Sequence, residues 1–205
     1  MTDEQILQLE KLANKGLIED IPYLQPRNVW TDEIPKDYDY EYIRGEHELP
    51  EGWQSLFLDM CKDIKEPLEK ANYLHKFRFT QIKEKYGSLR AYNNGCPEEV
   101  HDILLKYERL SKFTCNKCGR LAIKESRGYI LPYCKHCAKI ASKGKYPEKF
   151  DNIRFNPTIK ISGYKNGKKY KRILNCLKEF LLYHLNRNNK TPFEIIYGKA
   201  KEESK

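Results

Sequence analysis

The sequence predicts an α+β fold in which a small core of helices and a β-hairpin is followed by two smaller modules. Three observations predict it. Apolar residues change between helical and strand spacing in the first half, two Cys-x-x-Cys pairs follow, and Lys and Arg then gather around an Asn-Gly turn. We expect an N-terminal helical arm at 1–21, an α+β core at 22–112, a four-cysteine module at 113–143 and a basic hairpin-helix module at 151–205.

The chain begins with a short amphipathic stretch and a long irregular segment. Residues 3–14 carry a loose apolar face, which predicts a helix that docks on the core. Residues 22–50 contain four prolines among several tyrosines. This composition favours an extended loop wrapped on the core, with its aromatic side chains used for packing.

A helix, a β-hairpin and a second helix are expected next. Apolar residues recur at helical spacing from Trp53, and Pro67 is expected to end or kink that helix. Residues 77–82 and 88–92 are predicted to be strands joined by a turn at 85–87. The second helix is predicted by an apolar face made of Val100, Ile103, Leu104, Tyr107 and Leu110.

The spacing of four cysteines predicts a metal site. Cys115 and Cys118 form one Cys-x-x-Cys pair, and Cys134 and Cys137 form another, with fifteen residues between the pairs. Two residues between thiolates let one tight turn place both sulfurs on a tetrahedral ion, and Gly119 permits the sharp backbone path. We expect one structural zinc ion, because four thiolates leave no coordination position for water or substrate.

The residues around these cysteines predict the type of zinc finger. Short strands at 121–124 and 128–131 are expected to flank a turn at 125–127, and a helix is expected to run from the second pair to residue 142. A turn, a hairpin and a helix in this order describe a treble-clef finger.

Four clustered cysteines are also compatible with sites other than a structural zinc ion. An iron-sulfur cluster or redox dithiols are the alternatives to zinc. A His-Asn-His nuclease needs a histidine-rich hairpin, and residues 119–133 contain no histidine. We expect His136 to face solvent, Lys135 to help neutralise the thiolates, and Cys61 and Cys176 to be buried as small apolar side chains.

Charge is unevenly distributed along the chain, whose net charge is +9. Residues 1–110 hold 15 Lys and Arg against 22 Asp and Glu, a net charge of −7, and residues 111–205 hold 23 against 7, a net charge of +16. Such a cationic half favours a polyanionic partner, and nucleic acid is preferred to a membrane because no strongly basic amphipathic helix appears. A solvated basic surface is the alternative.

The basic module carries the densest cluster of cations. Residues 158–164 and 169–172 are predicted to be strands around an Asn-Gly turn, and the apolar spacing from Ile173 predicts a helix after them. This order is similar to the sheet-type DNA-binding modules of phage integrases. The main nucleic-acid contacts are expected from Lys160, Lys165, Lys168, Lys169, Lys171 and Arg172.

Part of the chain resembles a group of uncharacterised bacterial and bacteriophage proteins. The resemblance rests on Gly52-Trp53, on the stretch QIKEKYGSLRAY at 81–92 and on the cysteine pairs, and it covers residues 26–140. It implies a bacterial or phage-encoded protein and no known activity.

Within that stretch, Lys83, Lys85 and Arg90 gather with Tyr86 and Tyr92 around one turn. A basic and aromatic hairpin can hold phosphates and stack a base. Cross-strand packing with solvated lysines is the alternative.

Together these observations predict a non-enzymatic zinc-binding protein that binds nucleic acid through basic hairpins. The alternative is a protein-interaction module of phage or mobile-element origin that binds and inhibits a host protein. An enzyme is disfavoured because the sequence offers no nucleophile, phosphate loop or paired acid and base at informative spacing. A polar N-terminus and the lack of a long apolar run predict a cytoplasmic location.

Overall fold

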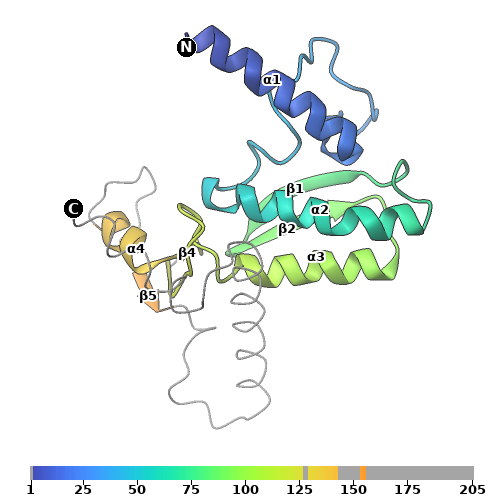
Figure 1. Cartoon of the computed structure of the whole chain (residues 1–205). Helices are drawn as coiled ribbons and strands as arrows, with labels where there is room; N and C mark the ends of the chain where they lie inside the picture. The colour runs from blue at the N-terminus through green and yellow to red at the C-terminus, as the bar shows by residue number, and fades with distance from the viewer. Residues whose placement is uncertain (1, 127–128, 143–152, 156–205) are drawn as a thin grey trace. The chain divides into compact units, whose positions relative to one another are not determined.

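The computed structural model describes residues 2–126, 129–142 and 153–155, and it divides the chain into two compact units, Met1–Glu108 and Arg109–Lys205 (Figure 1). Helices are combined with small antiparallel sheets, which confirms the predicted α+β class. The predicted C-terminal hairpin and helix lie outside the described residues. Within the described part, no helix is both long enough and apolar enough to cross a bilayer.

The N-terminal helix α1, Asp3–Asp20, extends beyond the predicted 3–14. A capping box starts it: Gln5 N–H donates to Thr2 Oγ1, and Thr2 N–H donates to Gln5 Oε1. The buried apolar residues lie at its C-terminal end, at Ile18 and Ile21. The apolar residues of the predicted docking face are largely exposed, namely Ile6, Leu9 and Leu12.

The segment that follows begins and ends with single turns of 3-10 helix, Pro22–Leu24 and Glu51–Trp53. Its tyrosines pack on one another, since the Tyr38 ring centroid lies 5.2 Å from that of Tyr40 and 5.6 Å from that of Tyr42. These contacts agree with the expected packing role of the aromatic side chains.

Helix α2, Gln54–Lys70, supplies the largest apolar face of the first unit. The helix continues past Pro67 to Lys70, so the proline does not end it. Pro67 lies in the last turn, where it removes only one backbone hydrogen bond. Its ring is buried, as is the side chain of Leu68. The face turned to the core consists of Leu56, Phe57, Met60, Cys61, Ile64 and Leu68.

Strands β1, Phe79–Lys85, and β2, Ser88–Asn93, form the predicted hairpin. Lys85 pairs with Ser88, so the loop has two residues, Tyr86 and Gly87, and both have positive φ, at 52° and 74°. This is the type I′ turn that matches the twist of a hairpin. Glu84 Oε1 accepts the Gly87 N–H at 2.7 Å and fastens the turn.

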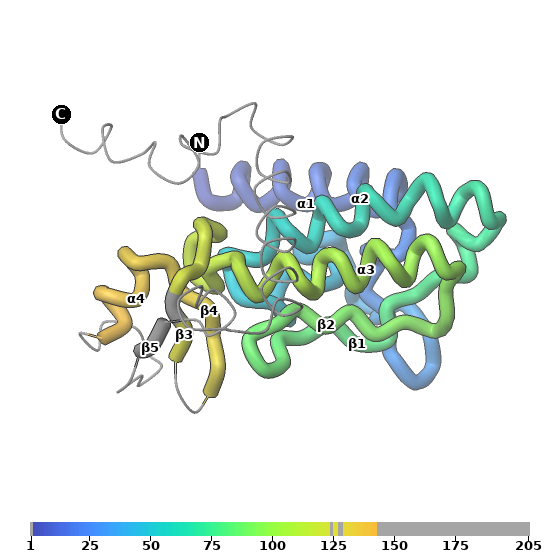
Figure 2. Tube along the Cα trace, turned by 90° about the horizontal axis from the view of Figure 1, so that it is seen from below, coloured from blue at the N-terminus to red at the C-terminus, as the bar shows by residue number. Residues whose placement is uncertain are grey.

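Helix α3, Glu98–Ser111, lies beside α2, and both run along the hairpin (Figures 1 and 2). The Tyr107 hydroxyl donates to Asp63 Oδ2 at 2.7 Å and links the two helices. Aromatic rings fill the core beneath the hairpin, with the ring centroids of Tyr23 and Phe77 5.3 Å apart. The helix and hairpin core was therefore predicted correctly in its elements and their order.

The second unit holds a three-stranded antiparallel sheet of order β4-β3-β5 and a short helix. Its elements are β3, Lys124–Ser126, β4, Pro132–Tyr133, α4, Lys135–Ala141, and β5, Ile153–Phe155. The predicted strands at 121–124 and 128–131 were misplaced, although a hairpin does precede the helix.

Hydrogen bonds explain why the strands are shifted. Ala122 N–H donates to the Phe113 carbonyl at 2.7 Å and Leu121 bridges to Thr114, so this stretch pairs with the segment before the cysteines. Ser126, predicted to lie in the turn, ends β3 instead. Its N–H donates to the Leu131 carbonyl and its hydroxyl oxygen accepts the Leu131 N–H.

Candidate metal centre

The first pair of cysteines lies on a tight backbone turn. Gly119 N–H donates to the Cys115 carbonyl at 3.0 Å, and Cys115 N–H donates to the Arg120 carbonyl at 2.7 Å. Gly119 has a φ of 72°, a conformation that disfavours side chains with a Cβ. The turn brings Cys118 back toward Cys115, as the spacing predicted.

The second pair lies where β4 meets α4. Cys134 is the N-cap of α4, and its sulfur accepts the Cys137 N–H at 3.3 Å, the bond that a serine or aspartate oxygen makes at other helix starts. This bond fixes the Cys134 side chain and directs Cys137, one turn on, toward the same point.

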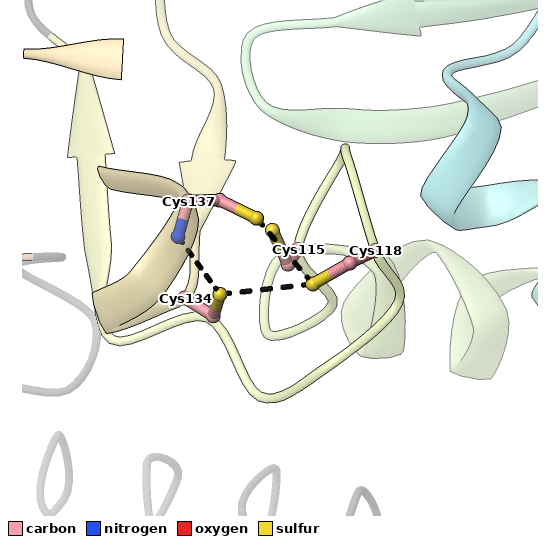
Figure 3. Close-up of side chains that lie close together, drawn as sticks. All are labelled: Cys115, Cys118, Cys134 and Cys137. Atoms are coloured by element: carbon pink, nitrogen blue, oxygen red, sulfur yellow. Dashed lines mark hydrogen bonds between the residues drawn. The ribbon is translucent and has the colours of Figure 1, made fainter. Parts of the chain in front are cut away.

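The four sulfurs converge, and Figure 3 shows the side chains pointing toward a common centre. Cys118 Sγ lies 3.6 Å from the Sγ atoms of Cys134 and Cys137, and all four sulfurs lie within 4.8 Å of one another. An ion bound tetrahedrally at about 2.3 Å separates its sulfurs by about 3.8 Å. A disulfide requires a sulfur–sulfur distance of about 2.05 Å, so the cysteines of this cluster are not joined by disulfide bonds. The cluster is close enough to hold one metal ion.

Hydrogen bonds among the thiols set their acidity. Hydrogen bonds from Cys115 and Cys118 lower the pKa of Cys134, and the Cys137 backbone N–H lowers it further against the opposing effect of burial. The pKa of Cys115 is raised, first by its hydrogen bonds to Cys118 and Cys134 and then by burial. The hydrogen bonds therefore favour the thiolate of Cys134, and a metal ion that binds here displaces thiol protons.

The surroundings of the cluster are mainly apolar on one side and open on the other. Three of its cysteines belong to a cluster of eight buried residues in the described part of the second unit. Cys118 is exposed. His136, between the second pair, is exposed as expected, and Lys135 beside it is exposed as well.

The remaining cysteines lie elsewhere. Cys61 is fully buried in α2, as predicted, and burial raises the pKa of its thiol. Cys96 is half-buried in the loop before α3, and burial raises its pKa too. Cys176 lies outside the described residues.

The basic residues predicted on the core hairpin do come together. Lys83 stands opposite Arg90 in the ladder, and its ammonium lies 5.3 Å from the Tyr92 ring centroid, while the ammonium of Lys85 lies 5.6 Å from the ring of the exposed Tyr86. Arg90 forms an ion pair with Glu108 at 2.5 Å. Within the described residues, Arg90 is neutralised by Glu108, whereas neither lysine forms an ion pair.

The six cations of the C-terminal hairpin lie outside the described residues, so the structure places none of them. They are Lys160, Lys165, Lys168, Lys169, Lys171 and Arg172.

Protein-family models, curated proteins and solved structures gave no match to this chain. The resemblance to bacterial and bacteriophage proteins stays a prediction.

One cluster in the first unit was missed by sequence reasoning. Arg27, Arg44 and Arg78 line a pocket with a volume of about 380 Å³. They stand far apart in the sequence, so no local spacing marks them.

Proposed function

We propose that the four-cysteine cluster binds one structural zinc ion. The observation that supports it is the convergence of four sulfurs within 4.8 Å. Thiolates select zinc or an iron-sulfur cluster, and sulfur separations of 3.6 Å suit a single tetrahedral ion. Because four thiolates fill the coordination shell, the ion holds the second unit together and does not activate water.

The order of elements supports a finger of the treble-clef type. A tight turn carries Cys115 and Cys118, the β3-β4 hairpin follows, and Cys134 and Cys137 lie at the start of α4. In this arrangement the metal joins the turn to the helix, and the hairpin between them completes the module.

We infer further that the protein binds nucleic acid through its basic residues and is not an enzyme. The observation that carries this proposal is the charge of +16 on residues 111–205, where five of the eight residues from Lys165 to Arg172 are cationic and none is acidic. Lys83 and Lys85, each close to a tyrosine ring, give the core hairpin a smaller surface of the same kind. Lysine contacts to phosphates give an affinity that falls steeply with salt.

The salt dependence of duplex binding tests this proposal. A variant with Lys165, Lys168 and Lys169 replaced by Gln should lower the slope of log affinity against log salt by roughly 2 to 3 units, since each phosphate contact contributes about 0.9. A matched control replaces three exposed lysines of the acidic half by Gln, namely Lys15, Lys36 and Lys62. The control should keep the wild-type slope.

Two results would count against this proposal. Equal slopes for both triple variants would move the contact away from the C-terminal segment. No binding of the wild type to duplex or single strands at ~50 mM salt would remove the nucleic-acid function.

The second candidate function is binding to a host protein in a bacterial or phage setting. Three exposed apolar side chains favour it, because Val29, Trp30 and Ile34 lie close together in the sequence with exposed fractions of 52%, 92% and 45%. Aromatic side chains exposed to this degree are enriched at protein interfaces. Binding that is insensitive to salt and lost on Trp30→Ala would support this candidate.

A further inference from the structure

The first unit contains a cationic pocket that none of the core hairpin residues Lys83, Lys85 and Arg90 lines. Its volume of about 380 Å³ falls within the range of small-ligand sites. The lining residues include four cations and one acid, namely Arg27, Arg44, Lys76, Arg78 and Asp32. Residues 1–108 as a whole hold 14 Lys and Arg against 22 Asp and Glu. Cations are therefore concentrated in the pocket against the overall charge of the unit, which favours an anionic ligand.

The three arginines retain unused hydrogen-bonding capacity. Each donates to a backbone carbonyl: Arg27 to Asp32 at 2.7 Å, Arg44 to Thr80 at 3.1 Å and Arg78 to Phe77 at 2.7 Å. In the described part of the chain, the Nε atoms of all three are buried and have no hydrogen-bond partner. A guanidinium carries five N–H donors, and buried donors normally find an acceptor. The carbonyls hold the side chains in place and leave donors for a ligand.

The charge of Arg78 is the least compensated of the three. Arg27 lies 3.7 Å from the Asp32 carboxylate and Arg44 lies 3.4 Å from that of Glu48, whereas no carboxylate of the described residues pairs with Arg78. Burial lowers the pKa of Arg78 and the neighbouring Arg27 lowers it further, while the charge of Asp32 opposes both effects only in part. Guanidinium groups that line one pocket repel each other, and a bound anion would reduce that cost.

Arg90 shows what a compensated arginine of this unit looks like. Its Nε is also buried and has no hydrogen-bond partner in the described residues, but its charge is neutralised by Glu108. Arg78 has the same unpaired Nε, but within the described residues it forms no ion pair with a carboxylate.

A loop that contributes Asn28, Val29 and Asp32 to the pocket wall also carries an exposed tryptophan, Trp30. Asn28 Oδ1 accepts the N–H of Trp30 at 2.8 Å, Asn28 N–H donates to the Glu33 carbonyl at 2.9 Å, and Asp32 N–H donates to the Asn28 carbonyl at 2.9 Å. Trp30 lies in this loop between the lining residues Val29 and Asp32, and 92% of it is exposed. The hydrogen bonds fix the loop backbone, and an exposed indole on a loop that also supplies a cationic pocket is suited to stack a nucleic-acid base.

We propose that this pocket binds a nucleoside phosphate, with the phosphate held by Arg27, Arg44 and Arg78 and the base stacked on Trp30. A guanidinium group can donate two parallel hydrogen bonds to two oxygens of one phosphate. Tyr23 and Phe79 are aromatic residues of the pocket lining. A free nucleotide and the phosphorylated end of a strand offer the same group. The site goes beyond the proposed function, because it lies in the acidic half and uses none of the C-terminal cations.

Titration of the full-length protein with adenosine 5′-monophosphate tests the proposal, read by tryptophan fluorescence. Trp53 is fully buried and Trp30 is exposed, so stacking should quench mainly Trp30 emission. Adenosine, which lacks the phosphate, should bind at least tenfold more weakly, and inorganic phosphate should compete with the nucleotide. Equal binding of adenosine and its monophosphate, or no binding of the monophosphate at ~1 mM, would overturn the proposal.

Variants measured by equilibrium dialysis locate the site. Arg78→Gln should weaken binding of the monophosphate by about tenfold or more, the loss expected for one hydrogen bond to a charged group. Arg78→Lys should restore part of it by keeping the charge. Trp30→Ala should weaken binding of the nucleotide and leave the affinity for inorganic phosphate unchanged. Lys62→Gln, an exposed position outside the pocket, is the control. Wild-type affinity in both Arg78→Gln and Trp30→Ala would refute the assignment.

Two further comparisons separate the sources of the phosphate and the two functions. The first comparison uses hexathymidylate with a 5′-phosphate, hexathymidylate with a 5′-hydroxyl, and the monophosphate. If the 5′-phosphorylated strand binds more tightly than the other two ligands, the pocket is assigned to a strand end. If the monophosphate binds most tightly, the pocket is assigned to a free nucleotide. The variant lacking Lys165, Lys168 and Lys169 should bind the monophosphate as wild type does. If that variant loses the monophosphate as well, the pocket is not an independent site and the proposal fails.

Discussion

Replacing Cys118 by Ser perturbs the metal centre at its exposed corner. Structural zinc binds zinc-finger peptides with an apparent free energy of about 10 to 16 kcal/mol, so one thiolate of four contributes about 3 to 4 kcal/mol. Zinc affinity should fall by about 10² to 10³-fold. Three of the eight residues in the buried cluster around the site are ligands, so the described part of the second unit should lose its order at chelator concentrations that leave the wild type loaded.

Competition with a chelator of known affinity measures this loss, and elemental analysis gives the metal content. Cys96→Ser is the matched control, because Cys96 is a half-buried thiol of the first unit outside the cluster. The fluorescence of Trp53 reports on the first unit and should not change in either variant. The reasoning is refuted if Cys118→Ser keeps one zinc at wild-type affinity. It also fails if the wild type, purified without chelator, holds less than about half an equivalent.

Three further substitutions test the description of the first unit. Tyr23→Phe removes the hydrogen bond to the Cys61 carbonyl and should lower the free energy of unfolding by about 1 kcal/mol at pH 7 in urea titrations. Burial raises the pKa of Tyr23, so the wild type should lose stability as the pH rises above about 10, and this loss should be smaller in the variant; parallel curves would contradict it. Gly45→Ala should cost about 2 to 5 kcal/mol, because φ is +90° and the added Cβ would lie 2.3 Å from the Phe57 ring. Gly16→Ala should instead raise the stability by about 0.5 to 1 kcal/mol, since nothing lies within 4 Å of the added Cβ; thermal unfolding that ranks the two alanine variants the other way would disprove both.

Features that depend on neighbouring residues could be predicted from the sequence. The cysteine pairs each lie on one short turn, so their spacing alone indicated that their sulfurs can share one ion. The turn predicted at 85–87 is equally local, because a glycine between two strand-forming stretches marks it; the structure narrows the loop to Tyr86 and Gly87.

Features that depend on distant partners could not be predicted in this way. Leu121 and Ala122 were predicted to lie in a strand, but only the structure reveals that they pair with residues 113 and 114 and not with 128–131. The pocket has the same limitation, because Arg27, Arg44 and Arg78 come from three separate segments that only the folded first unit brings together. The strands of the finger were misplaced and the pocket was missed for this one reason.

The unequal shielding of the four sulfurs has a consequence for the rate at which metal is exchanged. Cys115, Cys134 and Cys137 are buried, and Cys118 is exposed. In the proposed zinc centre, an incoming chelator or a metal-delivering protein would reach the ion at Cys118 and replace that sulfur while the other three stay bound. We therefore expect exchange to proceed one ligand at a time, without unfolding of the second unit. We expect a centre that binds its ion with high affinity at equilibrium and still exchanges it rapidly.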